Sequence, residues 1–547
     1  MQTSITYVEK AIAKLQSLHP GPGGAVAVIQ NGKVIGRQSW GYADLEQRIP
    51  MTCETKFPIC SITKQMICMV LFSIRQTQLS ESSSYANIEK QLSERLKVIL
   101  RDEIRDSKLT VQHLCNNQSG IRDYWALTVL FGAHPETRFL SPDAAKVLDR
   151  IRSLHFPPGD QFSYANTNFY ILARLLEDVT KRSIGELLSE KVFVPAGMTT
   201  AALCEDNSQL PGPCVGYEGN EESGFFKAQL THQWSGDAGV VASLDDMIAY
   251  EQHLQRLWHD PRSTYRRMAE PQFFRNDRLA RYGNGLFHTN VAGLPVLGHG
   301  GSVRGFRLAR LHVPAEELSI VVLFNHEADA ESAAEDMLKD LKSLTERKLA
   351  YVDPSAEWSG NYLDEEASLV AQIKVRDAKI IMTYAGFPES LTLADSTHAI
   401  SRSTFAEIDD DILFVTCMDH NRAFAARQIT SDYFCGVGEV VGAYYCAELD
   451  STFRCSGHGG ALYGSFDGIL GRGPAYLMKN LGEDIWVVST RRGLDAPAPG
   501  DWTVWFSRDE QGHIDKVTVG CWLARNLDFT RVHQTATREH LICDIND

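Results

Sequence analysis

The sequence lacks a hydrophobic run long enough to cross a membrane. Its longest uninterrupted apolar stretch covers residues 66–72, whereas a membrane-spanning helix needs roughly 20 apolar residues. Residues 1–20 form an amphipathic helix pattern without the apolar core and small-residue cleavage site of a secretory signal. We therefore expect a cytoplasmic protein without a membrane partner.

A metal-binding pattern of cysteines is also missing. The twelve cysteines include no Cys-x-x-Cys pair and no Cys/His spacing that suits zinc. Cys60, Cys68 and Cys521 stand inside apolar runs, the usual place of reduced structural thiols. The sequence predicts a protein of a reducing compartment without a cysteine-based zinc site.

Positive charge is scarce: the chain has 54 Lys and Arg residues and 69 Asp and Glu residues, which gives a net charge of -15. This balance disfavours a nucleic-acid partner, which requires a basic surface. The chain is otherwise ordinary for a globular protein, with 44% hydrophobic and 22% charged residues. Its 547 residues are too many for one core and predict two to four domains.

The first part of the chain, to about residue 348, mixes strands and helices. Residues 24–41 read as a β-hairpin around Asn31-Gly32, a strong turn pair. Helical patterns follow to about Thr180, two strands are predicted within residues 307–325, and an amphipathic helix is predicted over residues 331–348. This order favours an antiparallel sheet flanked by helices, an α+β or α/β sandwich.

The pattern changes to short alternating strands after Ala350, separated by Gly, Asp and Asn. Such strands are typical of antiparallel β-barrels or sandwiches. Gly360-Asn361-Tyr362 and Gly442-Ala443-Tyr444 both open acidic segments, so we expect two similar β units with a boundary near residues 432–440.

Ser61-Ile62-Thr63-Lys64 is the first candidate site motif, at the start of an apolar helical stretch. Residues three apart on a helix are neighbours, so the hydroxyl and the amine meet on one face. Burial can keep a lysine partly neutral and able to take the serine proton, and a helix N-terminus favours an oxyanion. Serine and lysine are common, so this motif alone does not decide between catalysis and chance.

Tyr164-Ala165-Asn166 is the second motif, before an amphipathic helix. In extended backbone, residues two apart point the same way, so both side chains can enter one cleft. A phenol whose pKa is lowered by a neighbouring ammonium can shuttle protons, and an amide can hold a substrate carbonyl. The alternative is a tyrosine packed on the next helix, with Asn166 capping that helix.

His299-Gly300-Gly301-Ser302 is the third motif, before a predicted strand. Paired glycines let a substrate backbone lie against a strand edge, and His299 can offer a donor or a positive charge. The alternative is a histidine in a tight turn. A second His-Gly-Gly begins at His458, and we interpret it as a turn between two strands because no nucleophile precedes it in its own domain.

The three motifs in this order resemble the penicillin-recognising serine hydrolases. The stretches PICSITKQ, CNNQSGIRDYWAL, LDAPAPGDW and VGCWLARN resemble more narrowly the D-aminopeptidases of that superfamily. The resemblance implies a multidomain α+β/β protein: a β-lactamase-like α/β sandwich catalytic domain (1–348) and two antiparallel β-barrels (353–435 and 438–547). It also implies a homodimer, and the catalytic residues Ser61, Lys64, Tyr164 and His299.

Residues 491–501 form a long, proline-containing connection between two predicted strands of the last barrel. In the family such a loop reaches the active site. A carboxylate on it would bind the substrate's ammonium group and exclude longer chains. Asp495 is the candidate for this contact, and the alternative is a solvated acidic turn residue.

The expected reaction is therefore removal of an N-terminal D-residue from a peptide, amide or ester through a Ser61 acyl-enzyme. This mechanism requires no metal and no organic cofactor. Lys64 or Tyr164 takes the serine proton, the backbone amides of Ser61 and Ser302 bind the oxyanion, and Asn166, Gly300 and Gly301 line the substrate. Preference for D over L rests on the resemblance alone. An esterase, a D-amino-acid amidase, a DD-peptidase or a β-lactamase remains open on the same site, as does a non-catalytic binding protein.

Overall fold

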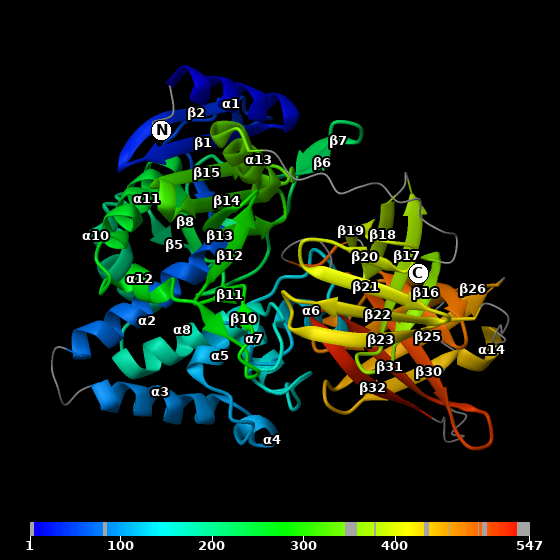
Figure 1. Ribbon diagram of the computed structural model, residues 1–547. Coiled ribbons are helices and arrows are strands. Elements are labelled where there is room, and N and C mark those ends of the chain that lie inside the picture. The colour runs from blue at the N-terminus through cyan, green and yellow to red at the C-terminus, as the bar shows by residue number, and fades with distance from the viewer. Residues whose placement is uncertain are drawn as a thin grey trace.

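The computed structural model describes residues 5–79, 85–344, 358–376, 379–430, 437–458, 460–490, 492–494 and 500–532. Helices and strands are mixed in the first part of the chain, which lies on one side of the molecule. The later part is built almost entirely of strands and lies on the other side (Figure 1). Over the described ranges, no helix combines the length and the apolar character needed to cross a membrane.

An eight-stranded antiparallel sheet forms the centre of the first part, in the order β11-β12-β13-β14-β15-β1-β2-β3. The predicted hairpin is confirmed: β1 and β2 pair, and Asn31 and Gly32 both have the positive φ that this tight turn requires. The strands of the eight-stranded sheet are β1 (Gly23–Gln30), β2 (Lys33–Asp44), β3 (Ile49–Pro50), β11 (Tyr282–Gly283), β12 (Leu286–Val291), β13 (Leu294–Val303), β14 (Phe306–Val313) and β15 (Leu318–Phe324).

Both faces of this sheet are covered by helices, as the sandwich prediction requires. Along β1, Ala25, Ala27 and Ile29 pack into one core with the central helices, while Val26 and Val28 pack into a second core with α1 and α13. The helices are α1 (Ile5–Leu18), α2 (Thr63–Leu79), α3 (Tyr85–Ile99), α4 (Asp102–Arg105), α5 (Val111–Cys115), α6 (Tyr124–Leu130), α7 (Ser141–Leu148), α8 (Asn166–Thr180), α9 (Ile184–Leu188), α10 (Val194–Ala196), α11 (Leu244–Trp258), α12 (Thr264–Met268) and α13 (Ala330–Lys342).

Further short strands of the first part pair outside the eight-stranded sheet. They form three small groups: β4 (Lys56–Pro58) with β8 (Val240–Ser243) and β5 (Ala202–Leu203); β6 (Tyr217–Asn220) with β7 (Gly224–Lys227); and β9 (Gln272–Phe273) with β10 (Leu279–Ala280). The helix predicted over 331–348 ends at Lys342, where Ser343 adopts a left-handed conformation; residues 345–348 lie outside the described residues.

Two antiparallel β-barrels follow, as predicted. The first, barrel 1, is a closed ring of eight strands. Its strands are β16 (Gly360–Asp364), β17 (Leu369–Arg376), β18 (Lys379–Tyr384), β19 (Phe387–Leu393), β20 (His398–Ile400), β21 (Thr404–Asp409), β22 (Ile412–Cys417) and β23 (Arg422–Gln428).

The second barrel, barrel 2, closes through pairing of β25 with β26. It begins with the short helix α14 (Val437–Val440), and its strands are β24 (Gly442–Cys446), β25 (Ser451–His458), β26 (Ala461–Gly468), β27 (Gly471–Arg472), β28 (Tyr476–Gly482), β29 (Ile485–Ser489), β30 (Asp501–Arg508), β31 (Ile514–Cys521) and β32 (Ala524–Arg531).

The two glycine-led segments noted in the sequence each open the first strand of a barrel, β16 and β24. The second His-Gly-Gly lies where β25 turns into β26, with His458 paired to Ala461, so its interpretation as a turn is confirmed. The domain limits at 348, 353 and 435 fall outside the described residues and stay predictions.

Barrel 2 packs directly against the first part of the chain. The backbone nitrogen of Asp123 donates to the oxygen of Leu523 at 3.0 Å, and that of Leu470 donates to Phe131 at 2.9 Å. Phe466 and Phe529 of barrel 2 belong to the same continuous core as the central helices. Barrel 2 is therefore fixed against the first domain, next to the residues that lead into α6.

Candidate active site

Ser61 lies at the junction of a strand and the buried helix α2. Strand β4 is followed by a short 3-10 helix (Cys60–Ile62), and α2 begins at Thr63. Cys60 has a φ of 50°, a left-handed conformation that few residues adopt outside constrained sites. This turn leaves Ser61 half-buried while its neighbours Cys60 and Ile62 are fully buried.

Lys64 is completely buried and turns its amine toward Ser61. Its Nζ lies 3.0 Å from Ser61 Oγ, 2.7 Å from Asn166 Oδ1 and 2.7 Å from the backbone oxygen of Asp237. The last two oxygens can only accept, so they take two N–H donors from the amine. The third position, toward Ser61, suits the remaining donor of an ammonium or the lone pair of a neutral amine. The geometry therefore accommodates Lys64 both before and after it takes a proton from the serine.

Asn166 is held by a buried carboxylate that the sequence interpretation missed. Asp123 Oδ1 accepts from the backbone nitrogen of Asn166 at 2.7 Å and from its side-chain nitrogen at 3.1 Å. Asp123 also caps α6 by accepting from Ala126. Burial raises the pKa of Asp123 to about 6, although these hydrogen bonds and the charge of Lys64 act to lower it. Its position before a helical stretch, in the sequence RDYWAL, is the cap signal that would have found it.

Asp237 is the second missed residue. Its side chain is fully buried and accepts hydrogen bonds from Tyr124 at 2.7 Å, Trp125 at 3.3 Å and the backbone of Ser235 at 3.0 Å. These contacts fix the backbone oxygen that receives Lys64. No sequence pattern marks this role, because the contact with Lys64 is made by the main chain.

Tyr164 lies where the second motif predicts, beside the serine and the lysine. Its phenol lies against Ser61, and Lys64 Nζ lies 5.0 Å from its ring centroid. The expectation that the ammonium lowers the phenol pKa is wrong. Burial raises the pKa of Tyr164 well above its usual range, the contact with Ser61 offsets this only in part, and the charge of Asp123 raises it further. The phenol is therefore protonated at neutral pH and is suited to give a proton.

The alternative that Asn166 serves only as a helix cap is also wrong. Ala165 precedes α8 as its cap residue and makes no side-chain cap hydrogen bond, while the Asn166 side chain is used by Lys64 and Asp123. Tyr164 and Asn166 thus enter the site together, as the Tyr-x-Asn spacing predicts.

His299 joins the same cluster of rings but does not bring a positive charge. Burial, followed by the nearby charge of Lys64, lowers its pKa to about 3, so the imidazole is neutral. Nδ1 lies 2.6 Å from the oxygen of Gly300 and must donate to it, which leaves Nε2 to accept from Tyr282 at 3.1 Å. The positive-charge interpretation is therefore wrong, and both ring nitrogens have partners. Tyr282 was missed because no motif surrounds it.

The glycines of the third motif bring β13 against the serine turn. A side-chain carbon on Gly301 would lie 2.4 Å from the oxygen of Ile59, so only glycine permits this approach. A side-chain carbon on Gly300 would point to the other face and meet Glu331. Pairing between β12 and β13 ends at Gly298; among the described strands, none pairs with residues 299–303 on that side. The exposed residue Ser302 thus lies on a strand edge that is open for a substrate backbone.

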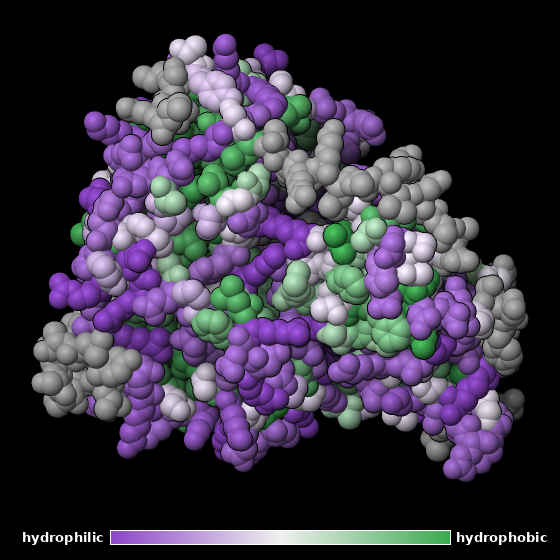
Figure 2. Space-filling model, in the orientation of Figure 1, coloured by the Kyte–Doolittle hydropathy of each residue, from purple (hydrophilic) through white to green (hydrophobic). Residues whose placement is uncertain are grey.

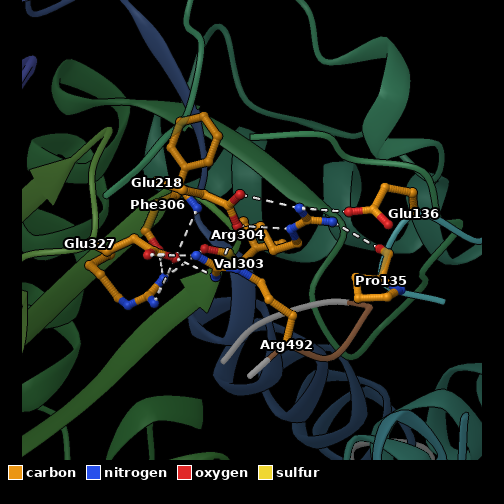
Figure 3. A network of polar contacts seen from close by, with 10 residues as sticks. Pro135, Glu136, Glu218, Val303, Arg304, Phe306, Glu327 and Arg492 are labelled. Atoms are coloured by element: carbon orange, nitrogen blue, oxygen red, sulfur yellow. Dashed lines mark hydrogen bonds and ion pairs between the residues drawn. The ribbon is translucent and has the colours of Figure 1, made fainter. Parts of the chain in front are cut away.

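Arg492, the second residue of the loop 491–501, is bound to the first domain. Arg492 Nη1 lies 2.9 Å from Glu218 and 3.3 Å from Glu327. Glu218 is shared with Arg304, which directly follows β13 and also contacts Pro135 and Glu136 (Figure 3). Burial acts to raise the pKa of Glu327, but Arg492 and neighbouring cations lower it overall. This ion-pair network attaches the start of the loop to the strand that carries His299.

The far end of the loop is attached to barrel 1. The nitrogen of Asp501 donates to the oxygen of Ala385 at 3.1 Å, and a side-chain carbon on Gly500 would lie 2.2 Å from that same oxygen. Leu494 is buried in the continuous core that the first domain shares with barrel 2. Asp495 lies outside the described residues, so its predicted contact stays a prediction.

Comparison with known proteins identifies both parts of the chain. A family model described as Beta-lactamase matches residues 8–344, and one described as D-aminopeptidase, domain B matches residues 351–530. A protein named D-aminopeptidase from Brucella melitensis biotype 1 is 39% identical over 527 residues, covering 96% of this chain and 98% of that protein. A D-aminopeptidase from Brucella anthropi is 37% identical with the same coverage.

A solved structure shows a similar fold at low sequence identity. The octameric penicillin-binding protein homologue from Pyrococcus abyssi aligns with a TM-score of 0.52 and 19% identity, covering 77% of this chain and 100% of that chain. At this identity the likeness describes the fold alone.

Proposed function

The chain belongs to the D-aminopeptidase family of β-lactamase-like serine hydrolases, and from that premise we propose that it removes N-terminal D-residues from small peptides, amides and esters. The observation that carries the proposal is the buried amine of Lys64, 3.0 Å from Ser61 Oγ and oriented by two acceptors that are not nucleophiles. This arrangement is that of an activated serine.

In the proposed acylation, Lys64 takes the proton of Ser61 as the serine oxygen attacks the substrate carbonyl. Tyr164 then gives its proton to the leaving amine, the C–N bond breaks, and Lys64 returns a proton to the phenolate. The raised pKa of Tyr164 supports this division of roles, because a protonated phenol is a donor and not a base. Water subsequently hydrolyses the ester on Ser61 and releases the free D-amino acid.

We assign binding of the oxyanion of the tetrahedral intermediate to the backbone amides of Ser61 and Ser302. The close approach of Gly301 to Ile59 supports this assignment, since it brings β13 against the turn that bears the nucleophile. Asn166, Gly300 and Gly301 would line the substrate, whose backbone extends along the open edge of β13. His299 takes part as a neutral imidazole that, with Tyr282, forms the wall of the site.

Recognition of the free amine is assigned to the loop 491–501, with Asp495 as the carboxylate. Attachment of Arg492 to Glu218 and Glu327 supports a loop that reaches the catalytic domain. A carboxylate held there would pair with one ammonium group and block longer chains on the amino side.

The proposal is tested with the para-nitroanilides of D-alanine and L-alanine, each with and without an N-acetyl group. We expect rapid hydrolysis of the free D-alanine compound and little of the other three. Equal rates of hydrolysis of the free and acetylated D-substrates would contradict an aminopeptidase and favour an esterase, amidase or DD-peptidase activity at the same site. No turnover of any compound or its ester would favour a binding protein.

We also propose a cytoplasmic homodimer. The family resemblance is the only support for the dimer, and the description "octameric" belongs to the Pyrococcus abyssi protein alone. Light scattering of the purified protein distinguishes a dimer from a monomer or a larger assembly.

A further inference from the structure

A large apolar cavity lies where barrel 1 faces the catalytic domain. Its volume is about 590 Å³, within the range of pockets that hold small organic ligands. Figure 2 shows that the surface is hollowed between the two sides of the molecule. The cavity is lined by Phe162, Tyr164, Phe287, Met382, Tyr384, Phe387, Pro388, Glu389, Thr404, Val415, Cys417, His420, Arg422, Phe424, Trp522 and Leu523.

The lining combines all three domains at one end of barrel 1. Met382, Val415 and Phe424 belong to the interior core of that barrel, so the cavity is its mouth. Trp522 comes from the turn after β31 in barrel 2, the same turn whose Leu523 accepts the hydrogen bond of Asp123. Tyr164 forms the wall on the catalytic side.

The position of Tyr164 identifies which part of a substrate would reach this space. The group that protonates the leaving amine must face that amine, and Tyr164 touches both Ser61 and the cavity. We propose, on the basis of the function assigned above, that the mouth of barrel 1 binds the leaving-group side of the substrate and selects uncharged, apolar and preferably aromatic groups there.

The charges at the cavity disfavour a carboxylate. The guanidinium of Arg422 is paired with Asp364 and donates to Tyr384 at 2.6 Å. Burial and nearby arginines lower the pKa of His420 to about 3, so this imidazole is neutral. Glu389 accepts from Thr404 at 2.8 Å and adds negative charge at the lining. Among the lining residues, no cation is left to neutralise a free carboxylate, whereas the aromatic rings match an apolar leaving group.

The test compares three D-alanine derivatives: the amide, the benzylamide and the para-carboxybenzylamide. We expect kcat/KM for the benzylamide to exceed that for the amide by about tenfold to a hundredfold, the gain from burying one phenyl ring. It should also exceed that for the para-carboxybenzylamide, because the cavity would have to bury an unpaired carboxylate. Equal values for the benzylamide and its carboxylate analogue would overturn the proposal while leaving the aminopeptidase activity in place.

Two variants locate the effect. Val415→Trp fills the cavity, and Phe387→Ala removes a rim ring that is 45% exposed, so this second variant preserves folding if the first does not. Each should reduce the ratio of benzylamide to amide turnover. Phe414→Ala is the control: it removes an exposed aromatic side chain of the same barrel that does not line the cavity, and it should leave the ratio unchanged. An unchanged ratio in Phe387→Ala and Val415→Trp would contradict the proposal.

Binding to the Ser61→Ala protein separates this proposal from the hydrolytic function. Calorimetry should show D-alanine benzylamide binding about tenfold more weakly when Val415→Trp or Phe387→Ala is added. If the benzylamide binds in this way but the native protein hydrolyses none of the three compounds, the proposed function fails and the site remains. If neither added change weakens binding, the site fails.

Discussion

Nζ of Lys64 lies 3.0 Å from Oγ of Ser61, although the lysine stands in α2 and the serine in the 3-10 turn before it. Two further contacts of Nζ reach Asn166 and Asp237, more than a hundred residues away. The amine is thus held by distant segments in a position where its lone pair or its third proton meets the serine hydroxyl.

Replacing this amine should therefore remove catalysis without removing the fold. We expect Lys64→Met to lower kcat by about a hundredfold to ten-thousandfold, the usual contribution of a general base. Lys56→Met, on the strand before the nucleophile, is the matched control and should retain activity. Steady-state rates and circular dichroism measure both, and near-native turnover by a folded Lys64→Met protein would remove Lys64 from the mechanism.

Asp123 should shape the acid side of the pH profile. Its pKa is raised to about 6 by burial, so below that pH it loses the charge that holds Asn166. We expect kcat/KM to fall as pH falls through about 6, and Asp123→Asn to lack this step. A step of the same size and position in Asp123→Asn would assign it to another group.

The carboxyl group of Asp123 should also make the stability of the protein depend on pH. Its pKa is about 6 in the folded protein against an ordinary 3.8, so the folded state binds the proton more tightly than the unfolded chain. The free energy of unfolding should therefore rise as pH falls from about 6 to about 4, by up to about 3 kcal/mol from this group. Denaturant unfolding of the native and Asp123→Asn proteins over this range isolates the contribution, which the variant should lack.

The loop 491–501 should control recognition of the free amine. We expect Asp495→Ala to raise KM for D-alanine para-nitroanilide more than for its N-acetyl derivative, because only the first has an ammonium group. Arg492→Ala should act in the same direction, since it releases the loop from Glu218 and Glu327. Arg454→Ala, which breaks an exposed pair on the same barrel, is the control. An equal effect on both substrates would exclude the loop from amine binding.

The buried pair of Glu251 and Arg310 should be a large contributor to the stability of the catalytic domain. Both side chains are fully buried, with nitrogen–oxygen distances of 2.6 and 2.7 Å, and Arg310 lies opposite His299 in β14. Glu251→Gln leaves a buried cation without its partner and should reduce the free energy of unfolding by about 3–5 kcal/mol. Asp340→Ala breaks an exposed pair with Lys14 and should change little. Urea unfolding compares the two, and equal midpoints would contradict this assignment.

Local patterns were sufficient to predict the features that depend on local chemistry. The turn at Asn31-Gly32 depends on two residues that tolerate positive φ, and the two barrels depend on alternating strands that begin at Gly360 and Gly442. The Ser-x-x-Lys spacing predicts the contact of Ser61 with Lys64 because it follows from helix geometry.

Features that depend on distant packing could not be predicted in this way. Asp237 holds Lys64 through a backbone oxygen, which any residue type possesses. Tyr282 reaches His299 because β11 and β13 lie in one sheet. The pKa of the Tyr164 phenol is set chiefly by burial, which depends on packing by distant segments. The apolar mouth of barrel 1 requires three domains to meet, so no single stretch of sequence encodes it.

The central claim is that Ser61 becomes acylated by the D-residue it releases. Rapid quenching of the reaction with D-alanine methyl ester, followed by intact mass measurement and peptide mapping, tests this directly. We predict a gain equal to one alanyl group on the peptide containing Ser61, and no gain in Ser61→Ala. Turnover without any such adduct on native protein, or an adduct on another residue, would contradict the account.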